Sequence, residues 1–182
     1  MPATISLTET QTMTALRAVL LGIVPAGVEV IRAQQNRVPE PVGPDFVLLT
    51  PILRTRLATN VDTYTDAPLA APPVGTRNSL APMQITVQID VHGPASADNA
   101  QMISTLLRDE YGCIAFAATG YDVQPLYADD PRETAFENGE QQTEYRWSVD
   151  AVLQANPVIG TPHDFADVLN VGLIEVDATY PP

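Results

Sequence analysis

The sequence contains no lysine. Its nine basic residues are all arginines and stand against 22 acidic residues, which gives a formal net charge of −13. Proteins that hold a nucleic-acid backbone do so with clustered cations that displace counterions, so this charge balance disfavours a DNA-gripping role. Without lysine the phosphate-binding motif G-x-x-x-x-G-K-[ST] cannot occur, and no G-x-G-x-x-G segment is present either. Nucleotide hydrolysis is therefore not expected.

Cysteine and histidine are also scarce. Cys113 is the only cysteine, which excludes an intrachain disulfide and a cysteine-based metal site, and we expect it to be a buried apolar filler at the end of a helix. His92 is expected at the surface where a strand ends. His163 with Asp164 and Asp167 is a weak metal motif, for which an N-cap at Asp164 is the more ordinary explanation. The sequence predicts no cofactor.

Long apolar runs are missing as well. No run approaches the roughly 18 residues needed to span a bilayer, and the N-terminus lacks the pattern of a secretory signal. The longest candidate, Ala18–Val28, is interrupted by Gly22 and Pro25. We therefore expect a soluble protein made in a reducing cytoplasm, with no membrane partner. A length of 182 residues suits one domain over residues 1–182, and 17 prolines predict long, stiff loops.

The clearest pattern lies between Met83 and Tyr111. Apolar and polar residues alternate strictly over 84–92, which predicts a strand with one buried face. Gly93 and Pro94 end this strand, and Ser96 offers an N-cap for an amphipathic helix that follows. A strand joined directly to a helix predicts a two-layer nucleus to which the other segments add.

The N-terminal segment predicts a helix followed by two strands. Either Ser6 with Glu9 or Thr8 with Gln11 could form a capping box. The apolar stripe of the helix consists of Met13, Leu16, Leu20 and Ile23. Strands are then predicted over 28–33 and 46–59. We interpret them as a long β-hairpin with an elaborate tip, and Pro51 makes the second strand an edge or bulged strand.

The rest of the chain alternates loops and strands. Residues 60–82 contain four prolines and predict no secondary structure, so we interpret them as an arm with a functional role. A weak strand is predicted over 123–127, an acidic loop over 129–142 and a second regular strand over 144–154. The tail, beyond a bend marked by Pro157 and Pro162, has one possible helical turn (165–169) and a final strand (171–179). This order favours an α+β fold, in which two helices pack on one face of a mainly antiparallel sheet.

Two charged groups of residues are candidate interaction sites. Four arginines of the predicted hairpin form either a cationic patch or scattered surface charges: Arg32, Arg37, Arg54 and Arg56. The partner of such a patch would be the acidic region of a neighbouring copy. The acids between Asp109 and Asp150 could suggest catalytic carboxylates or calcium binding. No D-x-[DN]-x-[DN]-G loop occurs, however, and a solvated acidic loop is the simpler interpretation.

Two segments resemble the neck or tail terminator proteins of tailed bacteriophages. The first is Gln34-Gln35-Asn36-Arg37-Val38-Pro39-Glu40-Pro41, preceded by a helix and a strand and followed by the strand that starts at Phe46. In that family, a hairpin turn carries a Gln/Asn-Arg-x-Pro-x-Pro segment. The second is residues 84–93, which match a family strand of the form Gln-x-x-Val-Gln-x-Asp-x-x-Gly leading into a helix. The resemblance covers residues 16–111 well and is vaguer beyond them.

The resemblance implies a structural protein of the virion, with no enzymatic activity. Family members form a ring, usually a hexamer, that caps the head-proximal end of the tail tube and joins it to the head connector. The expected partners are thus other copies, the tube protein and the connector, while genome DNA passes through without specific binding. The expected subunit interface includes Arg32, Gln35, Asn36, Arg37, Pro39, Arg54, Arg56, Pro72 and Pro73. The expected channel lining includes Asp90, Asp129, Asp130, Glu137 and Glu140, because acidic groups repel phosphate.

Three alternatives stay open. One is a generic bacterial α+β domain with an unassigned partner, which a strictly monomeric state in solution would support. Other head–tail connector, tail completion or minor tail proteins share small ring-forming α+β domains, and their place in the particle would differ. A metal-dependent enzyme is a weaker alternative, which rests on His163, Asp164, Asp167 and the acidic loop.

Overall fold

The computed structural model describes residues 2–33, 41–66, 75–134, 136–137, 143–165 and 171–172. Within them the helices are α1 (Glu9–Ile23), α2 (Ser96–Leu107) and α3 (Glu110–Ala118). The long strands are β3 (Phe46–Arg56), β6 (Met83–His92) and β11 (Arg146–Ala155). The shorter strands are β1 (Thr4–Ile5), β2 (Glu29–Arg32), β4 (Val61–Thr65), β5 (Gly75–Leu80), β7 (Val123–Ala128), β8 (Arg132–Glu133), β9 (Phe136–Glu137), β10 (Thr143–Glu144) and β12 (Val158–His163). The predicted α+β class is confirmed.

The larger sheet has the strand order β2-β3-β6-β11-β7, and β8 pairs with the end of β11. The two strands that alternation predicted best, β6 and β11, are inner strands of this sheet. They pair antiparallel along their whole length. In this register Ile89 lies between Leu49 of β3 and Val149 of β11. All three side chains are essentially buried, so one face of the sheet is apolar across neighbouring strands.

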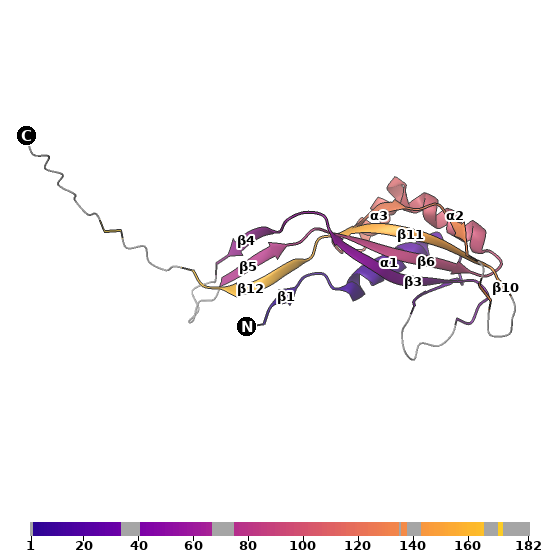
Figure 1. Cartoon of the computed structure of the whole chain (residues 1–182), viewed down its shortest axis with the longest axis horizontal. Coiled ribbons are helices and arrows are strands. Elements are labelled where there is room, and N and C mark those ends of the chain that lie inside the picture. Colours follow the sequence, from indigo (N-terminus) through magenta and orange to yellow (C-terminus); the bar gives the residue numbers. More distant parts are fainter. Residues whose placement is uncertain are drawn as a thin grey trace, which may run out of the picture.

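All three helices cover that apolar face. The buried residues of α1, α2 and α3 belong to one hydrophobic cluster with the inward residues of β3, β6, β7 and β11. The predicted stripe of α1 is confirmed, because Met13, Leu16, Leu20 and Ile23 are all buried. The prediction of two helices was incomplete: α3 is a third, and it packs beside α2 over β7 (Figure 1).

A smaller sheet prolongs the larger one (Figure 1). Its strand order is β1-β12-β5-β4. Three strands of the larger sheet run directly into it, since β3 leads to β4, β5 leads to β6 and β11 leads to β12. Backbone hydrogen bonds continue through the junction, from Leu57 N to Pro82 O and from Ala81 N to Pro157 O, both 3.0 Å. The two sheets are therefore parts of one long three-stranded ribbon.

The predicted hairpin of residues 28–59 is wrong. Strands β2 and β3 are parallel neighbours, and a parallel pair cannot be the two arms of a hairpin. The long hairpin of this protein is instead formed by β3 and β4 on one side and β5 and β6 on the other, antiparallel throughout. The proline-rich part of the predicted arm, residues 67–74, lies outside the described residues.

Two segments that predicted no regular structure contain strands. Residues 60–82, the predicted arm, include β4 and β5. The predicted bend between Pro157 and Pro162 is strand β12, which tolerates Pro162 near its end and pairs with both β1 and β5. The acidic loop also contains two very short strands, β8 and β9, and β10 follows directly after it.

Local signals at the helix ends explain further outcomes. Thr8 and Gln11 form the capping box of α1, which decides between the two predicted boxes. Ser96, the predicted N-cap of α2, is instead the first helical residue, and Ala95 precedes it without a side-chain cap. Gly93 turns the chain with φ +99°, and a Cβ there would meet Pro44 O at 2.2 Å, so only glycine fits. The predicted helical turn after Phe165 and the predicted final strand beyond Gly172 lie outside the described residues.

Candidate functional site

The most distinctive surface is a free edge that runs along β3, the link 57–60 and β4. Strand β2 pairs with β3 only over residues 46–49. Beyond that point no described strand pairs with β3 on the side away from β6, and β4 is the outermost strand of the smaller sheet. Every residue from Ile52 to Asp66 is exposed. We call residues 50–65 the free edge.

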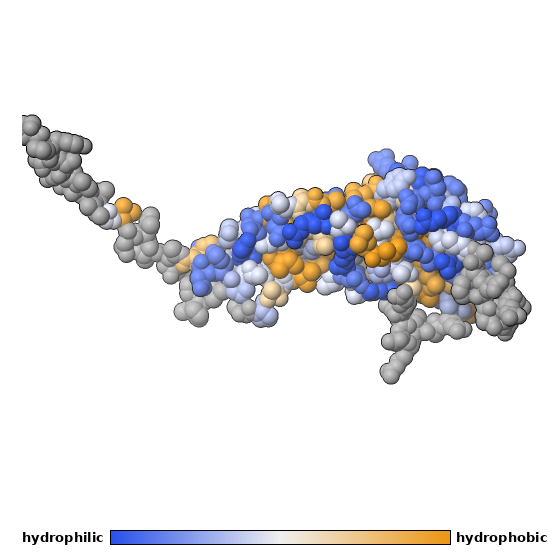
Figure 2. Space-filling model, in the orientation of Figure 1, coloured by the Kyte–Doolittle hydropathy of each residue, from blue (hydrophilic) through white to orange (hydrophobic). Residues whose placement is uncertain are grey.

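The free edge carries large apolar side chains in a position where soluble proteins usually place none. Five of them are at least 45% exposed: Ile52, Leu53, Leu57, Val61 and Tyr64. Hydrophobic residues gather around the junction of the two sheets on the surface in Figure 2. A long exposed edge strand offers unpaired backbone groups to another chain, and apolar side chains add to that tendency. The free edge therefore has the properties of a contact surface.

Two predicted interface arginines meet beside this edge. The Glu9 carboxylate accepts hydrogen bonds from Arg32 and, at 2.8 Å, from Arg54. One carboxylate facing two guanidinium groups leaves a net positive charge. Arg56 adds another, because it forms no ion pair with a described residue. Arg32 and Arg54 thus lie together, although β2, β3 and α1, rather than a hairpin, bring them together, and Arg56 follows two residues farther along β3.

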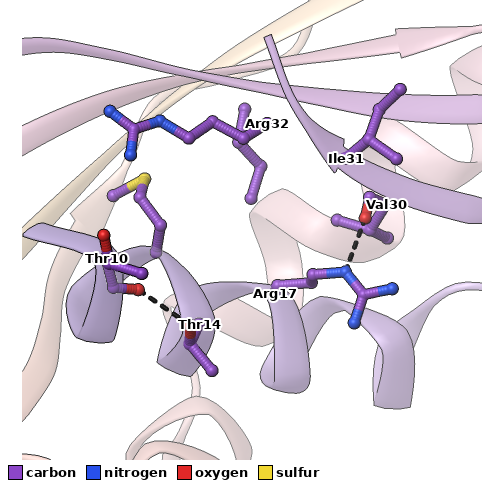
Figure 3. Close-up of a pocket in the computed structure, with 8 residues that line it drawn as sticks. Thr10, Thr14, Arg17, Val30, Ile31 and Arg32 are labelled. Carbon is purple, nitrogen blue, oxygen red and sulfur yellow. Dashed lines mark hydrogen bonds between the residues drawn. The ribbon is translucent and has the colours of Figure 1, made fainter. Parts of the chain in front are cut away.

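A groove lies next to this arginine cluster, between α1 and β2 (Figure 3). Thr10, Thr14 and Arg17 line it from α1, while Val30, Ile31 and Arg32 line it from β2. Arg17 Nε donates to Val30 O at 2.7 Å, which fixes the guanidinium at the rim. Sequence reasoning missed Arg17 because nothing in the local pattern shows that this face of α1 borders a strand.

The acids predicted to line a channel occupy different environments. Asp90 is only 7% exposed, and it accepts hydrogen bonds from Gln88 and Ser148 while Arg146 Nε lies 3.4 Å away. It is therefore a buried structural carboxylate, and an exposed lumen position for it is not supported. Asp150, on the same sheet face, pairs with Arg132 and holds the pKa of that guanidinium above its ordinary value.

The remaining acids of the predicted channel lie at or near the acidic loop. Asp130 has an 89% exposed side chain and pairs with Arg108 at 2.9 Å. Asp129 is half-buried, and its backbone bonds to Asp150 and Ser104. Glu137 is described only as part of strand β9, and Glu140 lies outside the described residues. Six residues of the predicted interface also lie outside them: Gln35, Asn36, Arg37, Pro39, Pro72 and Pro73.

The predictions for His92 and Cys113 are wrong. His92 is buried at 7% exposure and stacks on Phe46, because the start of β3 covers the end of β6. Burial lowers its pKa, which Asp90 and Glu144 raise and Arg146 lowers further. Cys113 is exposed on α3, not buried.

The residues of the weak metal motif do not come together as ligands. His163 ends strand β12, where its ring lies against Tyr64 and Phe165. Asp164 follows without starting a described helix, and Asp167 lies outside the described part of the chain. Across the residues that are described, no group of three histidine, cysteine or carboxylate side chains is arranged to hold a metal. None of the described helices is long and apolar enough to cross a membrane.

Comparison with known protein families shows to which family this chain belongs. The model of the phage neck terminator protein family matches residues 10–180. The chain belongs to the phage neck terminator family. This neck terminator is accordingly a structural protein of the neck of a tailed-phage virion, as the resemblance implied. A search of curated proteins found no match to the chain.

Proposed function

We propose that this neck terminator assembles into a ring, expected to be a hexamer, that caps the head-proximal end of the tail tube and joins it to the head connector. The observation that carries the proposal is the family match, which spans residues 10–180 and so includes every strand except β1 and all of the helices except the first residue of α1. The role requires specific contacts with other chains and no bond-making chemistry.

Two features of the molecule support a role built on such contacts. The free edge exposes backbone and apolar side chains over residues 52–66, which a monomer with no partner would leave as an aggregation hazard. The arginine cluster at Glu9, Arg32 and Arg54 lies beside that edge on a chain of net charge −13. A cationic contact surface on an acidic protein favours association with the acidic surface of an identical copy.

The strong negative charge also supports passage of the genome through the ring. A channel lined by carboxylates repels phosphate and keeps DNA from sticking to the wall. Of the described candidates, Asp130 is the acid whose side chain is exposed enough to act in this way. We therefore propose that the end of the larger sheet that bears Asp129 and Asp130 faces the channel.

Electron microscopy combined with mass measurement tests the proposal. Purified protein should form annular particles in negative stain, with a mass that is a fixed multiple of 19.6 kDa. Tails assembled without the protein should lack the cap and fail to join filled heads, and added protein should restore joining. Failure of the added protein to bind tails would contradict the proposed role.

The position of the protein in the particle distinguishes a terminator from the alternative head–tail and tail proteins. Antibody-labelled particles should carry label between the head connector and the first tube ring. Label at the distal end of the tail would indicate a tail completion or minor tail protein instead, and label on isolated heads without tails would indicate a connector component.

A further inference from the structure

The free edge could pair with one further strand that runs along both sheets. Within the described residues, β3 beyond Leu49 and the whole of β4 have hydrogen-bonding partners on one side only. Apolar and arginine residues share this stretch, with Arg54 and Arg56 two positions apart. In a strand, residues two apart point to the same side of the sheet, so both guanidinium groups face the same way. A strand that pairs with this edge should therefore carry two acids with the same spacing.

The C-terminal segment of this chain has that pattern. Residues 171–179 read Val-Gly-Leu-Ile-Glu-Val-Asp-Ala-Thr, an apolar segment with Glu175 and Asp177 two positions apart. It contains no proline, and its β-branched residues favour an extended conformation. The two acids therefore match Arg54 and Arg56 in spacing and are opposite in charge.

The position of the tail favours a second copy as the donor. Strand β12 ends at His163, which pairs with Gly75 at the far end of the smaller sheet. The short described segment 171–172 lies beyond that end (Figure 1), and its Val171 is 72% exposed. To reach Arg56 of its own chain, the tail would have to turn and run back along the whole smaller sheet.

We propose that residues 171–179 of one copy add as a strand to the free edge of the next copy, with Glu175 and Asp177 facing Arg54 and Arg56. Strand addition supplies backbone hydrogen bonds for affinity and side-chain contacts for specificity. Because donor and acceptor surfaces differ, the contact is head-to-tail and produces a ring when the rotation between copies closes. This inference rests on the proposed function, because the added strand is proposed to join the identical chains of the ring.

Paired charge reversals in the full chain test this contact. Arg56→Glu changes the acceptor edge, and Asp177→Arg changes the position of the donor tail that is proposed to face Arg56. Arg56 is exposed and unpaired among the described residues, so its reversal should leave the fold intact, as checked by circular dichroism; Arg56→Gln serves as a milder second variant. Glu133→Arg, at an exposed acid away from the free edge, gives the tail variant a control with the same change in net charge.

Light scattering and sedimentation velocity measure the outcome. The wild-type chain and the control should assemble, while each reversed variant alone should associate at least about tenfold more weakly. An equimolar mixture of the two reversed variants should assemble again, because the reversed edge position of one chain then meets the reversed tail position of the other, while Arg54 still meets Glu175. Only pairing between copies predicts this rescue.

The alternative outcomes are distinguishable. Assembly of both reversed variants at wild-type strength, or reversed variants that stay apart when mixed, would overturn the strand addition while leaving the ring proposal standing. A wild-type chain that stays monomeric at every soluble concentration, with and without tail tubes, would overturn both the ring and the added strand.

Discussion

The imidazole of His92 stacks on the ring of Phe46 across the β3–β6 ladder, with ring centroids 4.5 Å apart and planes 7° apart. Both residues lie on the sheet face opposite the helices, which alternation marks as the polar face. Their stacking shows that this face is partly covered where β3, β6 and β11 begin or end together. Burial of this kind lowers the pKa of the histidine, because its charged form loses hydration.

Stability should therefore fall on mild acidification. The pKa of His92 is lowered from its ordinary value of 6.5 in the folded protein, whereas the unfolded chain keeps the ordinary value. As the pH falls through 6.5, the unfolded state takes up the proton first, so stability is fully present above that pH and decreases below it. The loss can reach about 1.4 kcal/mol per pH unit within the window between the two pKa values.

Urea unfolding between pH 7.5 and pH 5 measures this effect. His92→Phe keeps a ring against Phe46 and removes the titrating group, so its curve should lack the decrease. His163→Gln, at an exposed histidine, should retain it. Equal pH dependence in the wild type and His92→Phe would show that other groups cause the loss.

The buried carboxylate of Asp90 predicts a second effect. Its side chain is 10% exposed and Arg146 is the cation beside it, so Arg146→Met leaves a charge with too little solvent. We expect a loss of about 3 kcal/mol in unfolding free energy. The double variant Arg146→Met with Asp90→Asn should recover most of it, since the isolated charge is then gone.

The matched control for this pair is Arg132→Met. Its ion pair with Asp150 lies on the same sheet face, but the Arg132 side chain is 53% exposed. An exposed pair contributes about 1 kcal/mol or less. Equal costs for Arg132→Met and Arg146→Met would contradict the assignment of Asp90 as the buried partner.

These residues show what sequence reasoning could and could not find. The alternation over 84–92 predicted β6 and its apolar face correctly, because strand periodicity depends on the chain alone. It misplaced Asp90 and His92, because whether a polar face is covered depends on Phe46 and Arg146, which reach it from other strands. Alternation identifies the face of a residue and not what lies above that face.

Strand partners were harder to predict than strands. Both β2 and β3 were predicted, yet their parallel pairing was not, since two neighbouring strands in sequence normally form a hairpin. The candidate site was nevertheless partly predicted: Arg32 and Arg54 do meet, because both strands lie at the same edge of the sheet. Glu9, which joins them, comes from α1 and could not be found from the strand pattern.

Helix α1 offers a comparison of two adjacent leucines. Leu20 is fully buried in the core cluster, whereas Leu21 is 41% exposed. Leu20→Ala should lower the unfolding free energy by about 2–5 kcal/mol through lost burial and a residual cavity. Leu21→Ala should cost less than about 1 kcal/mol, because its site is open to solvent. Thermal or urea unfolding of the two variants checks the orientation of α1, and similar costs would refute it.

The exposed thiol of Cys113 gives a final prediction that bears on assembly. Cys113 lies on α3 beside Ile114, which is 63% exposed, so this helix face is open in the single chain. The native protein should react with one equivalent of a thiol reagent at a rate comparable with that of the unfolded chain, and Cys113→Ser should not react. Because the free edge, and not α3, is proposed to hold the copies together, the assembled ring should react equally fast. Strong protection of the thiol in the ring would instead place α3 at a subunit contact and assign its apolar face to a neighbouring copy.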